Sequence, residues 1–228
     1  MIERALLLVG SPKGPKSTSD ALGGYLLARL AERGIETETL MITPLLASEE
    51  GTQRLCTAAD WADLLVLAFP LYFDTLPAPV IRFMELFHAE RAADGRVQAR
   101  SNEQRLVAIV NCGFPEARHC DTALAITRRF AVESSIERAG GLALGGGGAI
   151  GGKRLEAAGG MARAARRSLD IAADALAAGK SVPDEALRLM AKPLMPAWLY
   201  STVGNLGWWW QARRWRAHRM LRRRPFGD

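Results

Sequence analysis

Cysteine is scarce in this sequence of 228 residues, and its three copies stand far apart. Cys56, Cys112 and Cys120 form neither an even set nor a regularly spaced one. A disulfide-based scaffold needs paired cysteines, so the class of small disulfide-rich secreted proteins is excluded. Scattered cysteines are typical of proteins in a reducing compartment, and we expect a cytoplasmic location.

Long apolar runs are missing as well. No stretch offers the roughly 20 unbroken apolar residues that a membrane-spanning helix needs. The apolar run that starts at Ala5 is too short for a secretory signal, and no small-residue cleavage site follows it. Hydrophobic residues make up 49% of the chain and charged residues 24%, as in ordinary globular domains. We therefore expect a globular domain with a sizeable core.

Acidic residues are almost absent from the C-terminal end. Residues 201–228 hold seven arginines and one acid, Asp228. The whole chain has 30 basic and 24 acidic residues, so residues 1–200 hold 23 of each and are neutral. The net charge of +6 therefore belongs to the tail, and the basic character of the protein concerns that segment alone.

Neither standard glycine-rich nucleotide motif is complete. The first apolar run leads into GSPKGPKSTSDAL (10–22), which contains neither the P-loop pattern nor G-x-G-x-x-G. This segment does place hydroxyl and ammonium groups before a predicted helix, whose unpaired N–H groups and partial positive charge favour a phosphate. Two interpretations stand at this point: a phosphate-binding loop, or a turn whose serine caps the helix.

Apolar runs alternate with helical patterns along most of the chain, which predicts a parallel sheet with helices on both faces. Ligands of such sheets bind beyond the carboxyl ends of the strands. The expected strands are 4–10, 35–42, 63–70, 105–112 and 140–148, with the second near a sheet edge. The expected helices are 17–34, about 51–60, 78–92, about 116–138 and 155–179.

Two further strand ends carry unusual residues. After the third strand, FPLYFDTLPAP (69–79) places Tyr72 and Phe73 in a loop, where they either cover a flat ligand ring or fold back onto the core. After the fourth, NCGFPE (111–116) ends on Asn111, and Gly113 permits an unusual backbone through which N–H groups approach a ligand. The glycine-rich 144–152 is either a flexible wall or a strand exit that needs close packing.

With these three strand ends, the chain resembles the flavodoxin-like NAD(P)H-dependent FMN oxidoreductases, which include quinone and azo-compound reductases. The resemblance covers about residues 3–180. It implies an α/β fold: a flavodoxin-like three-layer sandwich around a five-stranded parallel sheet of order 2-1-3-4-5, followed by a helical C-terminal extension. We expect an FMN-binding domain over residues 1–182 and a Trp- and Arg-rich extension over 183–228.

The resemblance also implies which residues hold FMN. The phosphate would be held by Ser11, Lys13, Ser17, Thr18 and Ser19. The isoalloxazine would be held by Pro70, Leu71, Tyr72, Phe73, Asp74, Asn111, Cys112, Gly113 and Phe114. The flavin itself supplies the redox chemistry, so no catalytic side chain is assigned. Iron–sulfur relatives carry a compact cysteine cluster, which this chain lacks, so no metal is expected. His119 is either a proton donor to a quinone or a plain helix residue, and we favour the second. We interpret Cys112 as a small buried residue.

The function that the resemblance implies is hydride transfer from NAD(P)H through bound FMN to a quinone or another small acceptor. The alternative is a non-catalytic flavodoxin-like module, either an electron carrier or a flavin-free protein that acts through its tail. Flavodoxins that serve as carriers are acidic, whereas residues 1–200 are neutral, so we favour the enzyme.

Five of the six tryptophans lie between residues 198 and 215, beside the arginines of the tail. Three roles compete for this segment. It packs on the body or on a second subunit of a homodimer, which we favour. It associates peripherally with an anionic membrane through residues 194–224, which comes second. It binds nucleic acid, which is the least favoured role.

Overall fold

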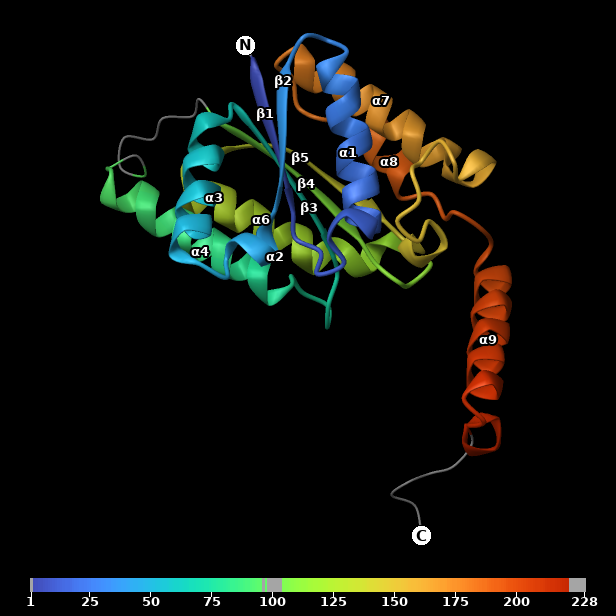
Figure 1. The fold of residues 1–228 in the computed structure, drawn as a ribbon. Coiled ribbons are helices and arrows are strands. Elements are labelled where there is room, and N and C mark those ends of the chain that lie inside the picture. The colour runs from blue at the N-terminus through green and yellow to red at the C-terminus, as the bar shows by residue number, and fades with distance from the viewer. Residues whose placement is uncertain (1, 96, 98–103, 222–228) are drawn as a thin grey trace. The chain divides into compact units, whose positions relative to one another are not determined.

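The computed structural model describes residues 2–95, 97 and 104–221 (Figure 1). The chain forms two compact units, Met1–Leu194 and Met195–Asp228. The first contains the sheet and its covering helices, and the second contains one long helix and a short 3-10 turn. The domain boundary predicted between residues 182 and 183 stays a prediction. The first compact unit extends beyond it, to Leu194.

One parallel sheet forms the centre of the first unit. Its strands are β1 (Arg4–Val9), β2 (Glu36–Met41), β3 (Leu64–Pro70), β4 (Arg105–Asn111) and β5 (Glu137–Leu144). Their spatial order is β2-β1-β3-β4-β5, which confirms the predicted flavodoxin-like topology. All seven residues of β4 are buried, whereas only one residue of β2 is, because β2 is an edge strand.

Helices cover both faces of the sheet (Figure 1). They are α1 (Thr18–Ala31), α2 (Ile42–Leu45), α3 (Glu49–Trp61), α4 (Ala78–Ala93), α6 (Asp121–Glu133), α7 (Arg163–Ala177) and α8 (Asp184–Met190). Helices α1, α7 and α8 pack on one face, and α2, α3, α4 and α6 pack on the other. Leu6 and Leu7 of β1 point into opposite cores, as the period of two along a strand requires.

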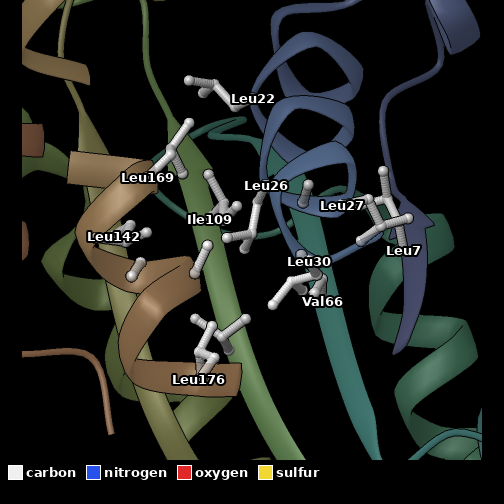
Figure 2. Close-up of a cluster of buried hydrophobic side chains, with 14 of the residues drawn as sticks. Leu7, Leu22, Leu26, Leu27, Leu30, Val66, Ile109, Leu142, Leu169 and Leu176 are labelled. Atoms are coloured by element: carbon white, nitrogen blue, oxygen red, sulfur yellow. The ribbon is translucent and has the colours of Figure 1, made fainter. Parts of the chain in front are cut away.

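Leucine is the commonest residue type in the core between α1, α7 and the sheet (Figure 2). Leu22, Leu26 and Leu30 recur along α1 at helical spacing, and all three are fully buried. They meet Leu169 and Leu176 of α7 over the middle of the sheet. This packing fixes the position of α1, and therefore of the loop that precedes it.

Two predicted helices were too long. The one expected over about 116–138 is a 3-10 turn at Ala117–Cys120 followed by α6, which ends at Glu133 because Ser135 adopts a left-handed φ of 52°. The one expected over 155–179 begins only at Arg163, since Gly159 adopts a φ of +61° that interrupts helical backbone. The short α2 was not predicted.

The C-terminal helices belong to different units. Helix α8 lies in the first unit, where Ala186 and Met190 are buried. Helix α9 (Ala197–Arg214) and a 3-10 turn at His218–Met220 form the described part of the second unit. Arg222, Arg223 and Arg224, part of the segment considered for membrane binding, lie outside the described residues. Across the residues that the structure describes, none of the helices combines the length and apolarity that crossing a bilayer requires.

Candidate functional site

The loop between β1 and α1 ends in a helix cap. Ser17 has extended backbone, and its Oγ accepts a hydrogen bond of 3.1 Å from the N–H of Asp20. This confirms that a serine caps the helix. The first turn of α1 still presents N–H groups that lack intrahelical partners, at the end of the helix that carries partial positive charge. The cap therefore does not exclude an anion, and the phosphate role stays a prediction.

The hydroxyl groups of this loop differ in what they contact. Thr18 Oγ1 donates to the carbonyl oxygen of Gly147 at 2.9 Å, and Ser19 Oγ accepts from Asn111 Nδ2 at 2.8 Å. Both side chains are buried, and Ser11 is buried too. Lys13 is exposed, and its ammonium group has no ion pair with any residue that the structure describes. Among the predicted phosphate ligands, Lys13 is thus the one that remains accessible and charged.

Asn111 connects three strand ends. Its Nδ2 donates to Ser19 Oγ and, at 3.3 Å, to the carbonyl oxygen of Phe69 at the end of β3. Its own carbonyl oxygen accepts from the N–H of Leu71 at 2.8 Å. A Cβ added at Gly147 would lie 2.9 Å from Asn111 Oδ1, so the segment after β5 also closes on this side chain. The structure thus brings the predicted residues of the first, third and fourth strand ends together.

The loop after β3 is a tight turn with strained backbone. Tyr72 and Thr75 exchange two backbone hydrogen bonds of 3.0 Å, and the residues between them, Phe73 and Asp74, have φ values of 49° and 59°. A bulky side chain in this region costs on the order of 1–3 kcal/mol, and such strain gathers at functional sites. Phe73 is fully exposed, so the interpretation that this ring folds onto the core is wrong.

The loop after β4 leaves space beside an aromatic ring. Phe114 is half-exposed, and its ring lies 4.4 Å from that of His119, centroid to centroid. A Cβ added at Gly113 would meet no heavy atom within 4 Å. The φ of Gly113 is not in the left-handed region, so the chain does not use the unusual backbone that glycine permits here. Gly113 would instead leave open space for a ligand next to the backbone.

Cys112 is buried, as expected, and sequence reasoning missed its partner. Its Sγ donates to the carbonyl oxygens of Phe114 at 3.4 Å and Glu116 at 3.6 Å. A hydrogen bond with the Cys120 thiol lowers the pKa of Cys112, and the same contact together with burial raises the pKa of Cys120. The two thiols lie eight residues apart in sequence, and no local spacing signal marked them as neighbours.

The glycine-rich segment 144–152 is a closely packed strand exit, which confirms the second of the two interpretations. A Cβ at Gly145 would lie 2.1 Å from the carbonyl oxygen of Pro115. One at Gly152, where φ is +73°, would lie 2.0 Å from the carbonyl oxygen of Lys16. Glycine is therefore required where this segment touches the loop after β1 and the loop after β4.

The arrangement suits a phosphorylated, flat aromatic ligand. A helix N-terminus with an accessible lysine suits a phosphate, and exposed rings beside open backbone suit a planar ring system. FMN combines these two parts, and the residues present fit it. The described residues hold no group of three or more His, Cys, Asp or Glu that would bind a metal ion.

Comparison with known proteins agrees with this geometry. No curated protein matches the chain. The Trp repressor binding protein of Bacillus subtilis is 11% identical with a TM-score of 0.55, over 73% of this chain and 96% of that one. An NADH:FMN oxidoreductase in its apo form is 16% identical with a TM-score of 0.53, over 85% and 96%.

These two structures show the fold. The family is shown by a sequence model described as NADPH-dependent FMN reductase, which matches residues 4–128. That match covers more than half of the chain and includes β1, β3 and β4 with the loops that follow them. The chain therefore belongs to the NADPH-dependent FMN reductase family and is an oxidoreductase that works with FMN and NAD(P)H.

Proposed function

We propose that this protein passes hydride from NAD(P)H through FMN to a quinone or another small planar acceptor. The observation that carries the proposal is the convergence on Asn111, which ties the N-terminus of α1 to the ends of β3 and β4. Beside this junction lie the exposed rings of Phe73 and Phe114. An open aromatic surface accepts flat molecules in succession, which supports a quinone as the acceptor.

The phosphate would be held at the start of α1. The ammonium group of Lys13 supplies charge, and the N–H groups of the first turn supply directed donors. Ser17 Oγ already accepts from Asp20, but its own O–H remains able to donate. Ser11, Thr18 and Ser19 are buried, as Ser17 is, and they support the loop from within. Thr18 and Ser19 do so through their bonds to Gly147 and Asn111.

The ring system would lie between the loops after β3 and β4. Tyr72, Phe73 and Phe114 supply aromatic surface, and Gly113 leaves space for an edge to approach the backbone. Pro70, Leu71 and Asp74 shape the first of these loops, and Cys112 packs beneath the second. FMN held between these loops would supply the hydride-transfer chemistry between the nicotinamide and the acceptor. The N–H of Phe114 would favour negative charge near that edge. The N–H of Cys112 already donates to the carbonyl oxygen of Leu144 at 3.0 Å.

No side chain is needed as a general acid or base in this scheme. His119 stacks on Phe114 and lies 3.7 Å from a carboxylate oxygen of Glu116. These contacts support its interpretation as a packing residue of the 3-10 turn. A homodimer and a cytoplasmic location remain part of the proposal, and no observation favours the non-catalytic alternative.

Anaerobic reductive titration tests the proposal. The purified protein, reconstituted with FMN, should lose its flavin absorbance band on addition of NADH or NADPH and regain it with a quinone. A carrier would not bleach without a separate reductase, so a persistent band with both nicotinamides would exclude the proposed activity.

A matched pair of glycine variants locates the activity. Gly113→Val should fold normally but lose bleaching, because its side chain enters the space left for the ring. Gly160→Val is the control, since a Cβ there also meets no heavy atom within 4 Å but lies on the turn before α7. Equal bleaching by both variants would contradict the assignment of Gly113.

A further inference from the structure

Helix α9 carries an apolar stripe that its own unit does not cover. Leu199, Val203, Leu206 and Trp210 recur at intervals of four, three and four residues, which places them on one face of the helix. Val203, Leu206 and Trp210 are all more than half exposed. Helical geometry places Trp198 and Trp209 to one side of this stripe and Trp208 on the opposite face of the helix.

Arginines cluster where the helix ends. Arg213, Arg214, Arg216 and Arg219 lie within the last turn of α9 and the residues after it, and all four are exposed. The Arg213 guanidinium lies over the Trp209 ring, 5.3 Å from its centroid. The sequence from 195 to 221 contains no Asp or Glu. The second unit is therefore a strongly cationic segment with an apolar face.

We propose that α9 and the arginines that follow it bind the surface of a membrane that contains anionic phospholipid. Tryptophan is enriched at the boundary between headgroups and acyl chains, and a stripe of Leu, Val and Trp can enter that boundary. Arginines beside it pair with lipid phosphates, and each cation near an anionic surface adds to the attraction. The inference concerns the second unit alone and does not rest on the proposed acceptor.

Two other partners fit the same segment less well. In a tail-to-tail pair of chains, arginines would face arginines, and residues 195–221 offer no carboxylate to neutralise them. Nucleic acid would pair with the arginines and stack on tryptophans, but it would leave Val203, Leu206 and Leu221 exposed. An anionic bilayer would both pair with the arginines and bury the aliphatic side chains.

Vesicle binding by the full-length protein tests the proposal. Sedimentation should show binding to vesicles of phosphatidylcholine with phosphatidylglycerol, little binding to phosphatidylcholine alone, and weakening by salt. Tryptophan fluorescence should shift to the blue on binding. Equal binding to both vesicle types, or no binding to either, would overturn the proposal.

Two charge-matched quadruple variants separate the tail from general electrostatics. Replacing Arg213, Arg214, Arg216 and Arg219 with Gln should weaken vesicle binding at least about tenfold. The control replaces four exposed arginines of the first unit, Arg54, Arg82, Arg128 and Arg129, and should keep the affinity within about threefold. Equal losses in the two variants would contradict a site on the tail.

A third variant tests the apolar stripe. Val203→Ser with Leu206→Ser keeps every arginine, and it should weaken vesicle binding while leaving any binding to duplex DNA unchanged. If duplex DNA displaces the protein from vesicles and this variant binds vesicles like the wild type, the tail is a nucleic-acid site. If the arginine variant changes only the oligomeric state in sedimentation velocity, the tail is a subunit contact.

Discussion

Ser17 caps a helix, and the proposed function gives it a second role that can be tested separately. Its Oγ caps α1 by accepting from the N–H of Asp20. In the proposed function, its O–H would also donate to a phosphate. Ser48 caps α3 in the same way, because its Oγ accepts from the N–H of Gly51 at 3.0 Å. Ser48 is not one of the predicted site residues. The structure therefore provides its own control for the cap.

We predict that Ser17→Ala and Ser48→Ala lower the free energy of unfolding by a similar amount, about 1 kcal/mol, because each removes one cap. Only Ser17→Ala should also weaken FMN binding, by about three- to tenfold for one lost donor to a charged group. Urea melts and equilibrium dialysis with FMN measure the two effects. Equal FMN affinities in the two variants would contradict a phosphate role for Ser17.

Ser19 and Asn111 show why residue type alone does not identify the hydroxyl groups that are available to bind a phosphate. Sequence reasoning grouped Ser19 with Ser17, since both precede or begin the helix. In the structure Ser19 is buried, and its Oγ accepts from Asn111, which is 92 residues away in the chain. No local pattern encodes that pairing, because it depends on where β4 lies next to β3.

At the scale of elements, Asp63 ties the start of β1 to the start of β3. Its Oδ2 accepts from the N–H groups of Glu3 and Arg4, both at 2.9 Å, and its Oδ1 accepts from the Arg4 guanidinium at 3.1 Å. Burial raises the pKa of Asp63, but these hydrogen bonds outweigh it and the pKa is lowered. The carboxylate form therefore stabilises the fold at neutral pH.

We predict that Asp63→Asn costs about 1–3 kcal/mol of unfolding free energy at pH 7, as expected for hydrogen bonds to a charged group. The folded pKa lies below the unfolded one, so this contribution is present above the unfolded value, about 3.9, and fades as pH falls through the folded pKa. Wild type and variant should thus converge in urea melts at acid pH. A difference that is constant from pH 7 to pH 3 would show that the charge is irrelevant. Glu85→Gln, an exposed carboxylate near Arg82, is the control.

Arg91 joins the ends of three helices, and the sequence pattern did not predict these contacts. Read along the chain, it is a charged residue near the end of α4. In the structure it is buried, and its Nε donates to the carbonyl oxygen of Ser134 at 2.9 Å, which caps α6. It also donates to Gln104 Oε1 at 3.3 Å, and Gln104 in turn donates to Ala59 and Ala62 at the end of α3. Buried charge is stabilised only by such complete pairing.

At the scale of the whole molecule, flavin binding should raise the free energy of unfolding, and it should do so more for FMN than for riboflavin, which lacks the phosphate. FMN at about a hundred times its Kd should stabilise the protein by about 2.7 kcal/mol. For a chain of 228 residues this corresponds to a rise in Tm of about 5–10 °C. Riboflavin, which lacks the phosphate, should raise Tm less at the same concentration, because it cannot use Lys13 and the N-terminus of α1.

Thermal melts with each flavin measure this difference. The gap between FMN and riboflavin should narrow in Lys13→Gln, whose side chain is exposed in the wild type. Equal shifts with FMN and riboflavin in the wild type would mean that the phosphate is not recognised at this loop.

The sequence alone determined the features that depend on short-range pattern. Short strand patterns predicted the five strands, and their alternation with helices predicted a parallel sheet with helices on both faces. The order β2-β1-β3-β4-β5 was implied by the family resemblance and is confirmed. A serine before a helix predicted the cap of α1. Simple counting placed the whole net charge in the last 28 residues. Each of these follows from periodicity, capping or composition, which neighbouring residues carry by themselves.

Tertiary structure decided which of the candidate groups remain available to a ligand. It used Thr18 and Ser19 internally, through partners 129 and 92 residues away, and left Lys13 accessible. It turned Phe73 outward on a strained turn and left open space at Gly113. These outcomes depend on how separate strands and helices pack against one another, and a polar group is free only where that packing supplies no partner.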